Sequence, residues 1–257
     1  MYLLGVTILT FKKIFFMLSY LMKKIIIGAT GAIGSSIAKK LVSNGSEVHL
    51  VARNQAEVET LASELNATFS VVDVLDDNFA KKVQDDLGDT PINGLAHCVG
   101  SIDLKPLKLS KKEDFIKTFN LNLISATEII RVMHENLKAN NGSIVLFSTV
   151  AARKGFTNHS IIASAKAAIE GLTVSLAAEF APNVRVNCIA PSLTKSKIAE
   201  FLLKNEKIAE GIAKLHPLKR IGEGIDFSAL ASFLLSKDSS WITGQIIGVD
   251  GGRSSVA

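Results

Sequence analysis

Two side chains that can carry protons, His159 and Lys166, stand close together in residues 158–170. If this segment is helical, residues three or four apart share one face, so His159, Ile162 and Lys166 form a single stripe. An imidazole can deliver a proton near neutral pH, whereas the Ile162 side chain can neither give nor take one. The stripe therefore predicts proton chemistry at His159 or Lys166. The alternative is that His159 is an ordinary loop histidine just before the helix.

A glycine-rich loop lies near the start of the chain, where Gly28, Gly31 and Gly34 follow an apolar run and open a helix-like segment. Glycine lets the backbone approach a phosphate closely, and the free N–H groups at a helix start favour negative charge. In this context the pattern predicts the pyrophosphate site of a dinucleotide. The alternative is a tight strand–helix turn that binds no ligand. The other loop residues of the predicted cofactor site are Thr30, Ala32 and Ile33.

The residues that end the second apolar run, Ala52 and Arg53, bear on which dinucleotide would bind. In dinucleotide-binding folds an acid here accepts from the ribose 2′-OH of NAD, and an arginine instead holds the 2′-phosphate of NADP. Ala52 stands where the acid would be, and the guanidinium of Arg53 can pair with phosphate in bidentate fashion. We therefore expect NADP(H) to be favoured, with NAD(H) as the alternative cofactor. A plain surface arginine is the alternative for Arg53.

The segments that must position these residues alternate between strand and helix. Nearly continuous Val, Ile and Leu runs are typical of strands buried on both faces, and their alternation with helices predicts right-handed crossovers. We therefore expect an α/β fold, a doubly wound parallel sheet of seven strands flanked by helices. The runs are 25–27, 48–52, 69–72, 94–99, 143–147, 184–190 and 245–249. Among the helices, we expect 33–44, 162–180 and 226–236.

Composition limits the class of protein. The chain has 257 residues, 47% of them hydrophobic, so it can bury one large core, and we expect a single domain over residues 22–257. The net charge is +5, but the basic residues are scattered in pairs without interleaved aromatics, which argues against nucleic-acid binding. Cys98 and Cys188 stand far apart without metal-ligand spacing, which predicts no metal site and fits a reducing, cytoplasmic compartment.

Residues 1–21 form an N-terminal extension that is nearly all apolar. Lys12 and Lys13 divide it into runs too short to span a bilayer, and it lacks the charged start and the cleavage site of a secretory signal. Met22 opens MKKIIIGATG just before the first strand, so an upstream start codon is one interpretation. An apolar arm that lies on a membrane surface or in an oligomer contact is the other.

Several motifs in order resemble the standard branch of the short-chain dehydrogenase/reductase family. The closing sequence SSWITGQIIGVDGG matches the family's almost word for word, and VRVNCIAPS carries Ser192 where the family has glycine. The glycine loop fits the spacing GxxxGxG with Ala32 in the second glycine position, rather than the GxxGxxG of the extended branch. The resemblance implies a single-domain Rossmann fold. It also implies hydride transfer between a nicotinamide and a small carbonyl or alcohol substrate.

One family residue is missing from the matching helix. In the family a Tyr four residues before the Lys supplies the proton that accompanies hydride transfer, and Ile162 stands there in this chain. The resemblance places Thr149 where the family has its catalytic Ser. It implies that Asn122 binds a water of the proton relay and that Lys166 binds the nicotinamide ribose. His159 is the candidate replacement donor. Two classes stay open: a working oxidoreductase, and a nucleotide-binding protein without turnover that acts as a sensor or a partner subunit.

The resemblance also extends the cofactor site. Asp73 matches the family's acid at the adenine ring, although it could equally be a helix N-cap. The family's NNAG motif reads His97-Cys98-Val99-Gly100 here, so only Gly100 is retained, and His97 fits a structural role better than a catalytic one. Further residues that the resemblance places at the cofactor are Val74, Pro191, Thr194 and Lys166.

Partners follow from the resemblance as well. In the family the helix that corresponds to residues 162–180 pairs with its copy in another subunit, and here it is rich in alanine. We therefore expect a homodimer or homotetramer. The substrate pocket is built by residues 192–216, where Ile198, Phe201 and Leu202 predict an apolar lid over a small-molecule substrate.

Overall fold

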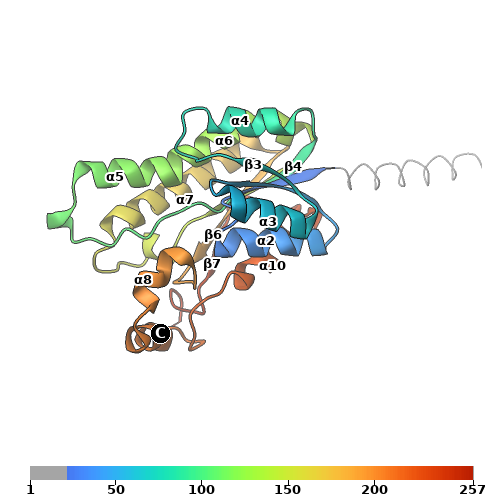
Figure 1. Cartoon of the computed structure of the whole chain (residues 1–257). Coiled ribbons are helices and arrows are strands. Elements are labelled where there is room, and N and C mark those ends of the chain that lie inside the picture. Colours follow the sequence, from blue (N-terminus) through green and yellow to red (C-terminus); the bar gives the residue numbers. More distant parts are fainter. Residues whose placement is uncertain (1–21, 257) are drawn as a thin grey trace, which may run out of the picture.

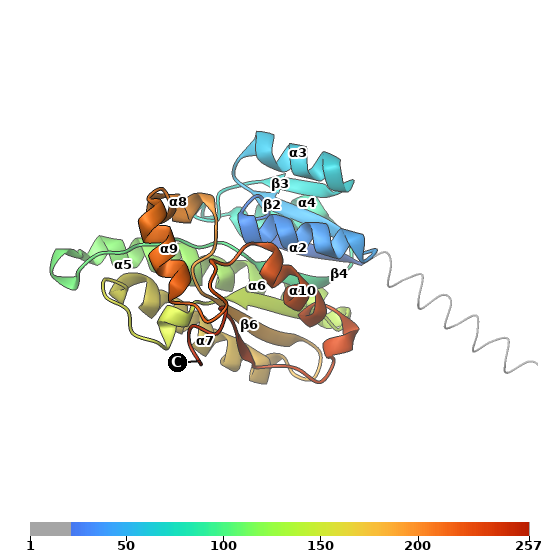
Figure 2. The same cartoon turned by 90° about the horizontal axis from the view of Figure 1, so that it is seen from below.

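A parallel sheet of seven strands forms the centre of the protein, with helices on both faces (Figures 1 and 2). The computed structural model describes residues 22–256, so the expectations for residues 1–21 lie outside the described residues. The strand order is β3-β2-β1-β4-β5-β6-β7. The strands are β1 Lys23–Ile27, β2 Glu47–Ala52, β3 Thr68–Val71, β4 Ile92–His97, β5 Ser143–Phe147, β6 Arg185–Pro191 and β7 Ile246–Val249.

The helices divide between the two faces of the sheet. One buried cluster joins the sheet to α4, α6 and α7, and a second joins its other face to α2, α3 and α10. The inner strands are therefore covered on both sides, as their continuous apolar runs predicted, whereas the edge strands β3 and β7 are partly exposed. The helices are α2 Ala32–Ser43, α3 Gln55–Leu65, α4 Phe79–Leu87, α5 Lys112–Phe119, α6 Ser125–Ala139, α7 Ser160–Phe180, α8 Glu200–Leu203, α9 Glu206–Lys214 and α10 Ile225–Leu234.

The predicted doubly wound sheet is confirmed, and the strand boundaries differ from the predicted runs only at the ends. The helix that carries Lys166 differs more, because α7 begins at Ser160 and not at residue 162. Asn158 takes a left-handed backbone with φ 66°, which ends the incoming loop and makes His159 the residue that caps the helix. The stripe of His159, Ile162 and Lys166 therefore runs from the helix cap into the first turns.

Helix α7 is apolar for most of its length. Its 21 residues make it the one helix among the described residues that is long and apolar enough to cross a membrane by length and composition. However, 44% of its apolar 18-residue stretch is buried inside the protein, and buried side chains of α7 pack with α4 and α6 against the sheet. A core helix of this kind passes the same test, so the finding is weak evidence for a membrane span.

Candidate active site

The glycine loop joins β1 to α2 at the place where the strand order reverses, between β1 and β4. Gly28 has a φ of +78°, a conformation that side chains disfavour. A Cβ at Gly34 would lie 2.3 Å from the backbone oxygen of Gly28, so only glycine lets α2 pack this closely against the loop. Glycine at position 34 therefore allows α2 to begin directly behind the loop, and the N–H groups of a helix start favour an anionic ligand.

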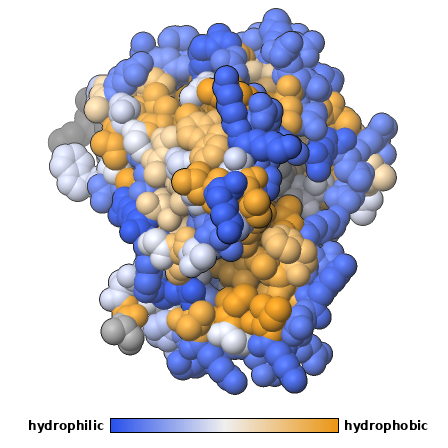
Figure 3. All heavy atoms as spheres, turned by 90° about the vertical axis from the view of Figure 1, so that its left-hand side faces the viewer, coloured by the Kyte–Doolittle hydropathy of each residue, from blue (hydrophilic) through white to orange (hydrophobic). Residues whose placement is uncertain are grey.

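A cavity of about 590 Å³ opens at the carboxyl ends of the strands, which is where open α/β sheets bind ligands. Figure 3 views the molecule from this side and shows hydrophobic side chains gathered in the hollowed part of the face, ringed by hydrophilic ones. Apart from Gly34 and Asn122, every residue that the sequence predicted for the cofactor or for catalysis lines this cavity. They are Gly28, Thr30, Gly31, Ala32, Ile33, Arg53, Asp73, Val74, Gly100, Thr149, His159, Lys166, Pro191 and Thr194.

Lys166 lies at the bottom of the cavity. Its side chain is only 7% exposed, and its Nζ donates a hydrogen bond to the backbone oxygen of Phe147 at 2.8 Å. Burial lowers the pKa of Lys166 to about 8, because the low-polarity surroundings disfavour the ammonium form. The residue is thus positioned by the end of β5, and it carries its charge at neutral pH.

Asn122 is fully buried in a π-helical turn, Asn120–Ile124, that joins α5 to α6. Its Nδ2 donates to the backbone oxygen of Thr118 at 2.8 Å, which leaves Oδ1 as a buried acceptor with no hydrogen-bond partner among the described residues. A Cβ at Gly100 would meet Lys166 Nζ at 3.2 Å and Asn122 Oδ1 at 3.3 Å. Glycine at position 100 therefore leaves room for a polar group that both side chains could bind.

The two hydroxyl residues after β5 have different surroundings. Ser148 is buried, and its Oγ donates to Glu170 Oε1 at 2.9 Å, which ties the strand end to α7. Thr149 is half-buried, and its Oγ1 accepts only a long contact from the backbone N–H of Ala151 at 3.3 Å. Of the two, Thr149 is the hydroxyl with donor capacity to spare for a carbonyl oxygen in the cavity.

His159 stands at the mouth of the cavity, one turn from Ile162. Its Nδ1 lies 2.7 Å from the backbone oxygen of Thr157, so Nδ1 carries a hydrogen and donates it to that carbonyl. The other ring nitrogen, Nε2, has no hydrogen-bond partner among the described residues. Ile162 is 5% exposed and lines the cavity between His159 and Lys166, so the predicted stripe does face the site.

One end of the cavity holds Arg53, the predicted selectivity residue, and Asp73, which the resemblance places at the adenine ring. Arg53 is 78% exposed, and its guanidinium lies 3.6 Å from the carboxylate of Asp73. Asp73 Oδ1 also accepts from the backbone N–H of Leu75 at 3.0 Å, so this acid caps a turn. The alternative that Asp73 is a helix N-cap is wrong, because α4 begins later and its N-cap is Asn78.

His97 and Cys98, which replace the family's paired asparagines, lie differently: Cys98 lines the cavity and His97 does not. His97 is buried away from the cavity, and its Nε2 lies 3.0 Å from Ser125 Oγ. Burial, together with the charge of Lys166, lowers the pKa of His97 to about 3, so it stays neutral in the folded protein. Burial raises the pKa of the Cys98 thiol to about 12, which keeps it protonated.

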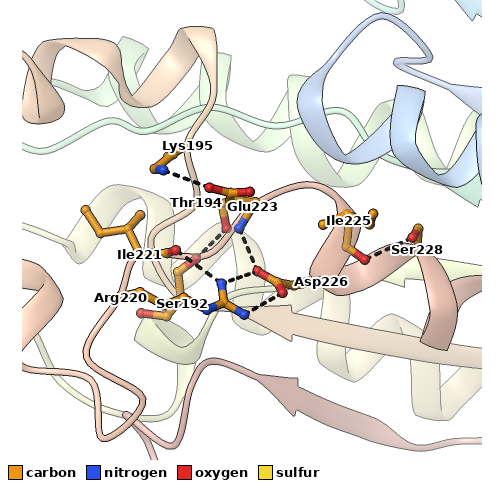
Figure 4. A network of polar contacts seen from close by, with 9 residues as sticks. All are labelled: Ser192, Thr194, Lys195, Arg220, Ile221, Glu223, Ile225, Asp226 and Ser228. Atoms are coloured by element: carbon orange, nitrogen blue, oxygen red, sulfur yellow. Dashed lines mark hydrogen bonds and ion pairs between the residues drawn. The ribbon is translucent and has the colours of Figure 1, made fainter.

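The segment after β6, residues 192–216, covers the cavity with apolar side chains and is called the cover below. Ile198 and Leu202 line the cavity as predicted, whereas Phe201 does not and is 57% exposed. Two ion pairs, shown in Figure 4, hold the ends of the cover. Arg220 contacts both carboxylate oxygens of Asp226 at 2.6 Å, and Lys195 contacts Glu223 at 2.7 Å. These contacts fix the position from which the cover extends over the site.

Among the lining residues that the sequence did not predict, three make contacts that shape the site. Lys197, on the cover, pairs with Glu57 of α3 at 2.7 Å and so ties the cover to the opposite wall. Arg253 and Phe156 both line the cavity, and the guanidinium carbon of Arg253 lies 5.0 Å from the centroid of the Phe156 ring. The sequence offers one signal for Arg253, a cation directly after the closing VDGG motif.

Comparisons with known proteins agree with this geometry. Residues 28–254 match the profile of a family described as Enoyl-(Acyl carrier protein) reductase. A tropinone reductase homologue of Arabidopsis thaliana is 35% identical over 238 residues, covering 89% of this chain and 90% of that protein. L-xylulose reductase of Bos taurus is 30% identical over 234 residues, covering 90% and 95%.

Solved structures share the whole fold. A short-chain type dehydrogenase/reductase from Mycobacterium ulcerans has a TM-score of 0.84 at 27% identity, over 91% of this chain and 90% of that one. A putative NAD(P)-dependent gluconate 5-dehydrogenase from Beutenbergia cavernae, with bound NADP at low occupancy, has a TM-score of 0.85 at 27% identity, over 90% and 96%. With the glycine cradle at the switch point and Lys166 below it, the chain belongs to the short-chain dehydrogenase/reductase family of NAD(P)-dependent oxidoreductases.

Proposed function

We propose that this protein is an NADPH-preferring reductase of small carbonyl compounds in which His159 stands in for the missing phenol as the proton donor. The observation that carries the proposal is that Thr149, His159 and Lys166 line one cavity with the glycine loop. A hydroxyl, an imidazole and an ammonium group therefore share the space in which a carbonyl would meet the nicotinamide. When bound, the nicotinamide supplies the hydride.

Each residue then has a distinct task. The glycine loop and the start of α2 bind the pyrophosphate, and Lys166 holds the nicotinamide ribose. Thr149 donates a hydrogen bond to the carbonyl oxygen of the substrate. Asn122 Oδ1, a buried acceptor beside Gly100, orders a polar group next to Lys166 Nζ. His159 delivers the proton from Nε2, because its Nδ1 is already engaged with the backbone oxygen of Thr157.

The competing function is that of a dinucleotide-binding protein without redox turnover. It is favoured by Ile162, a buried apolar side chain at the position closest to Lys166 in the stripe. Both functions need the cofactor, so cofactor binding cannot separate them. The test is to measure NADPH binding by its fluorescence and then to follow NADPH oxidation over a panel of ketones and aldehydes. Binding without oxidation of any compound would favour the non-catalytic function.

Arg53→Ala is expected to weaken NADPH binding by about 10- to 100-fold, because hydrogen bonds to charged groups are worth about 1.5–3 kcal/mol. NADH affinity should change by less than about twofold, since NADH has no 2′-phosphate for the guanidinium to bind. The measurement is fluorescence titration with both nucleotides.

Arg131→Ala is the matched control, because this exposed arginine pairs with Glu128 on α6 and does not line the cavity. It should leave both affinities unchanged. Equal affinities of the parent protein for NADPH and NADH would contradict the proposed preference and make Arg53 a plain surface residue.

We also propose that the protein assembles as a homodimer or homotetramer through α7. The face of α7 turned away from the sheet carries small side chains that leave a smooth, exposed surface. Its exposed residues include Ser164, Ala167, Gly171, Val174 and Ala178. A surface of this shape permits close packing against its own two-fold copy.

Gly171→Lys is expected to at least halve the mass measured by light scattering at micromolar concentration. A Cβ at Gly171 meets no atom within 4 Å, so the monomer accommodates the new side chain. Replacing glycine within a helix also stabilises the helix by up to about 1 kcal/mol. Gly211→Lys on α9, where a Cβ is equally unobstructed, is the control. A monomeric parent protein would contradict the proposed assembly.

For the domain organisation and the compartment, we propose one catalytic domain over residues 22–257 that works in the cytoplasm. Cys98 and Cys188 are free thiols, and burial raises the pKa of each to about 12. Protonated thiols without a disulfide fit a reducing compartment.

A further inference from the structure

Arg253 is a cation in the cavity that the family resemblance did not predict. It follows β7 after a turn at Gly251 and Gly252, whose φ values are 62° and 85°. Its backbone oxygen accepts a hydrogen bond from Lys154 Nζ at 2.8 Å. The turn and this bond direct the side chain inward, where it lines the cavity.

The guanidinium of Arg253 lies over the ring of Phe156, with its carbon 5.0 Å from the ring centroid. Stacking engages one face of the guanidinium and leaves the N–H groups at its edge available to an acceptor. The ring of Phe156 in turn lies 5.4 Å from that of His159, centroid to centroid. Arg253 therefore stands at the substrate end of the cavity, next to the proposed proton donor.

No carboxylate of the described residues balances this charge. Asp73 is the one acid among the described residues that line the cavity, and it pairs with Arg53 at the adenosine end. Arg253 forms no ion pair within residues 22–256. A half-buried cation that faces a cavity without an acid partner is costly to desolvate unless a ligand brings the negative charge.

The remaining walls at this end are apolar. Residues of the loop after β4 and of the cover supply aliphatic side chains, and Phe156 and Ile162 add to them. The aliphatic lining residues include Ile102, Leu104, Leu121, Ile198, Leu202 and Ile212. Such a cavity accommodates a carbon chain with one charged end.

We infer that Arg253 binds the carboxylate of the substrate, and that the substrate is an oxo acid with an apolar body. The inference rests on the proposed reductase function. In the reaction a hydride from the nicotinamide forms a C–H bond at the carbonyl carbon, and the carbonyl oxygen takes a proton. The nicotinamide is oxidised, the oxo acid becomes a hydroxy acid, and the carboxylate keeps its charge and its pairing with the guanidinium fork.

The test compares aliphatic oxo acids with their methyl esters, which have the same carbonyl and no charge. For the parent protein kcat/KM should be about 10- to 100-fold higher with the acid than with the ester. Arg253→Met should remove this preference by lowering kcat/KM for the acid, while the value for the ester and the NADPH affinity stay within about twofold. Arg253→Lys should restore part of the preference, because it keeps the charge without the bidentate fork. Arg131→Met, which removes a charge outside the cavity, is the control.

A second measurement separates this inference from the proposed function. Saturated fatty acids of the same length, which have no carbonyl to reduce, should raise the melting temperature of the NADPH-bound parent protein and have no effect on Arg253→Met. That binding, found without turnover of any carbonyl, would support the carboxylate site while the reductase function fails. Turnover of esters and acids at equal kcat/KM would overturn the carboxylate site while the reductase function stands. A preference for oxo compounds that end in phosphate would also overturn it, since the anion would then be of another class.

Discussion

Ile162→Tyr is expected to raise the rate of carbonyl reduction above that of the parent protein. The gain should reach about 100- to 10,000-fold where the parent has no proton donor, the range that a positioned general acid contributes, and should be smaller where His159 already donates. Ile162 is 5% exposed and faces a cavity of about 590 Å³, so a phenol that replaces it can extend into the cavity. Lys166 lies one helical turn further along the same face, and Thr149 lines the same cavity. The variant would therefore place a proton donor between a cation and a hydroxyl.

The charge of Lys166 gives this prediction a pH dependence. Burial lowers the pKa of Lys166 to about 8, so its side chain is an ammonium below that pH and a neutral amine above it. The ammonium favours the phenolate and so lowers the pKa of the new phenol, which makes it a better acid. We therefore expect the gain to be largest below pH 8 and to shrink as Lys166 loses its proton.

Ile162→Phe is the matched control, because it adds the same ring without the hydroxyl. If the gain comes from proton donation, Ile162→Phe should stay at or below the parent rate. Equal gains in the Phe and Tyr variants would show that the ring improves substrate packing, and the general-acid explanation would be wrong. The rates should be measured as NADPH oxidation at saturating cofactor, with the pH profile of each variant.

The fold could be predicted because its signals are local. Each strand is a short apolar run, and the glycine loop marks the strand–helix turn at the switch point, so the sheet and the cofactor edge follow from the sequence. The boundary of α7 was less accessible, since it depends on the left-handed conformation of Asn158. That two-residue difference matters at the site, because it makes His159 the cap of the helix.

Contacts between segments that are distant in the chain could not be predicted from the sequence. Arg253 stands near the end of the chain, and only the folded structure brings it over Phe156. The pair of Lys197 and Glu57 joins the cover to α3 across 140 positions of sequence. The unpartnered Oδ1 of Asn122 depends on a π-helical turn, for which no periodic pattern exists in the sequence.

His159→Ala is expected to lower the turnover of carbonyl substrates by about 10-fold or more while NADPH affinity is unchanged, because a proton donor acts on the transition state and not on cofactor binding. The reason is geometric. His159 lines the cavity one turn from Ile162, and its Nδ1–H bond to Thr157 leaves Nε2 as the ring nitrogen that can deliver a proton.

His159→Gln separates proton donation from structure, since an amide can keep the hydrogen bond to Thr157 but does not ionise. A structural role predicts that His159→Gln restores the parent rate, whereas a donor role predicts that His159→Gln is as slow as His159→Ala.

The double variant Ile162→Tyr, His159→Ala decides between the two proposed functions. In a reductase that uses His159, the phenol replaces the lost donor and the double variant is at least as fast as the parent. In a protein that only binds the dinucleotide, His159→Ala has no effect on turnover, and activity arises only in variants that carry Ile162→Tyr. Undiminished turnover in His159→Ala, compared with an active parent, would contradict both and show that the proton comes from another group or from a water relay.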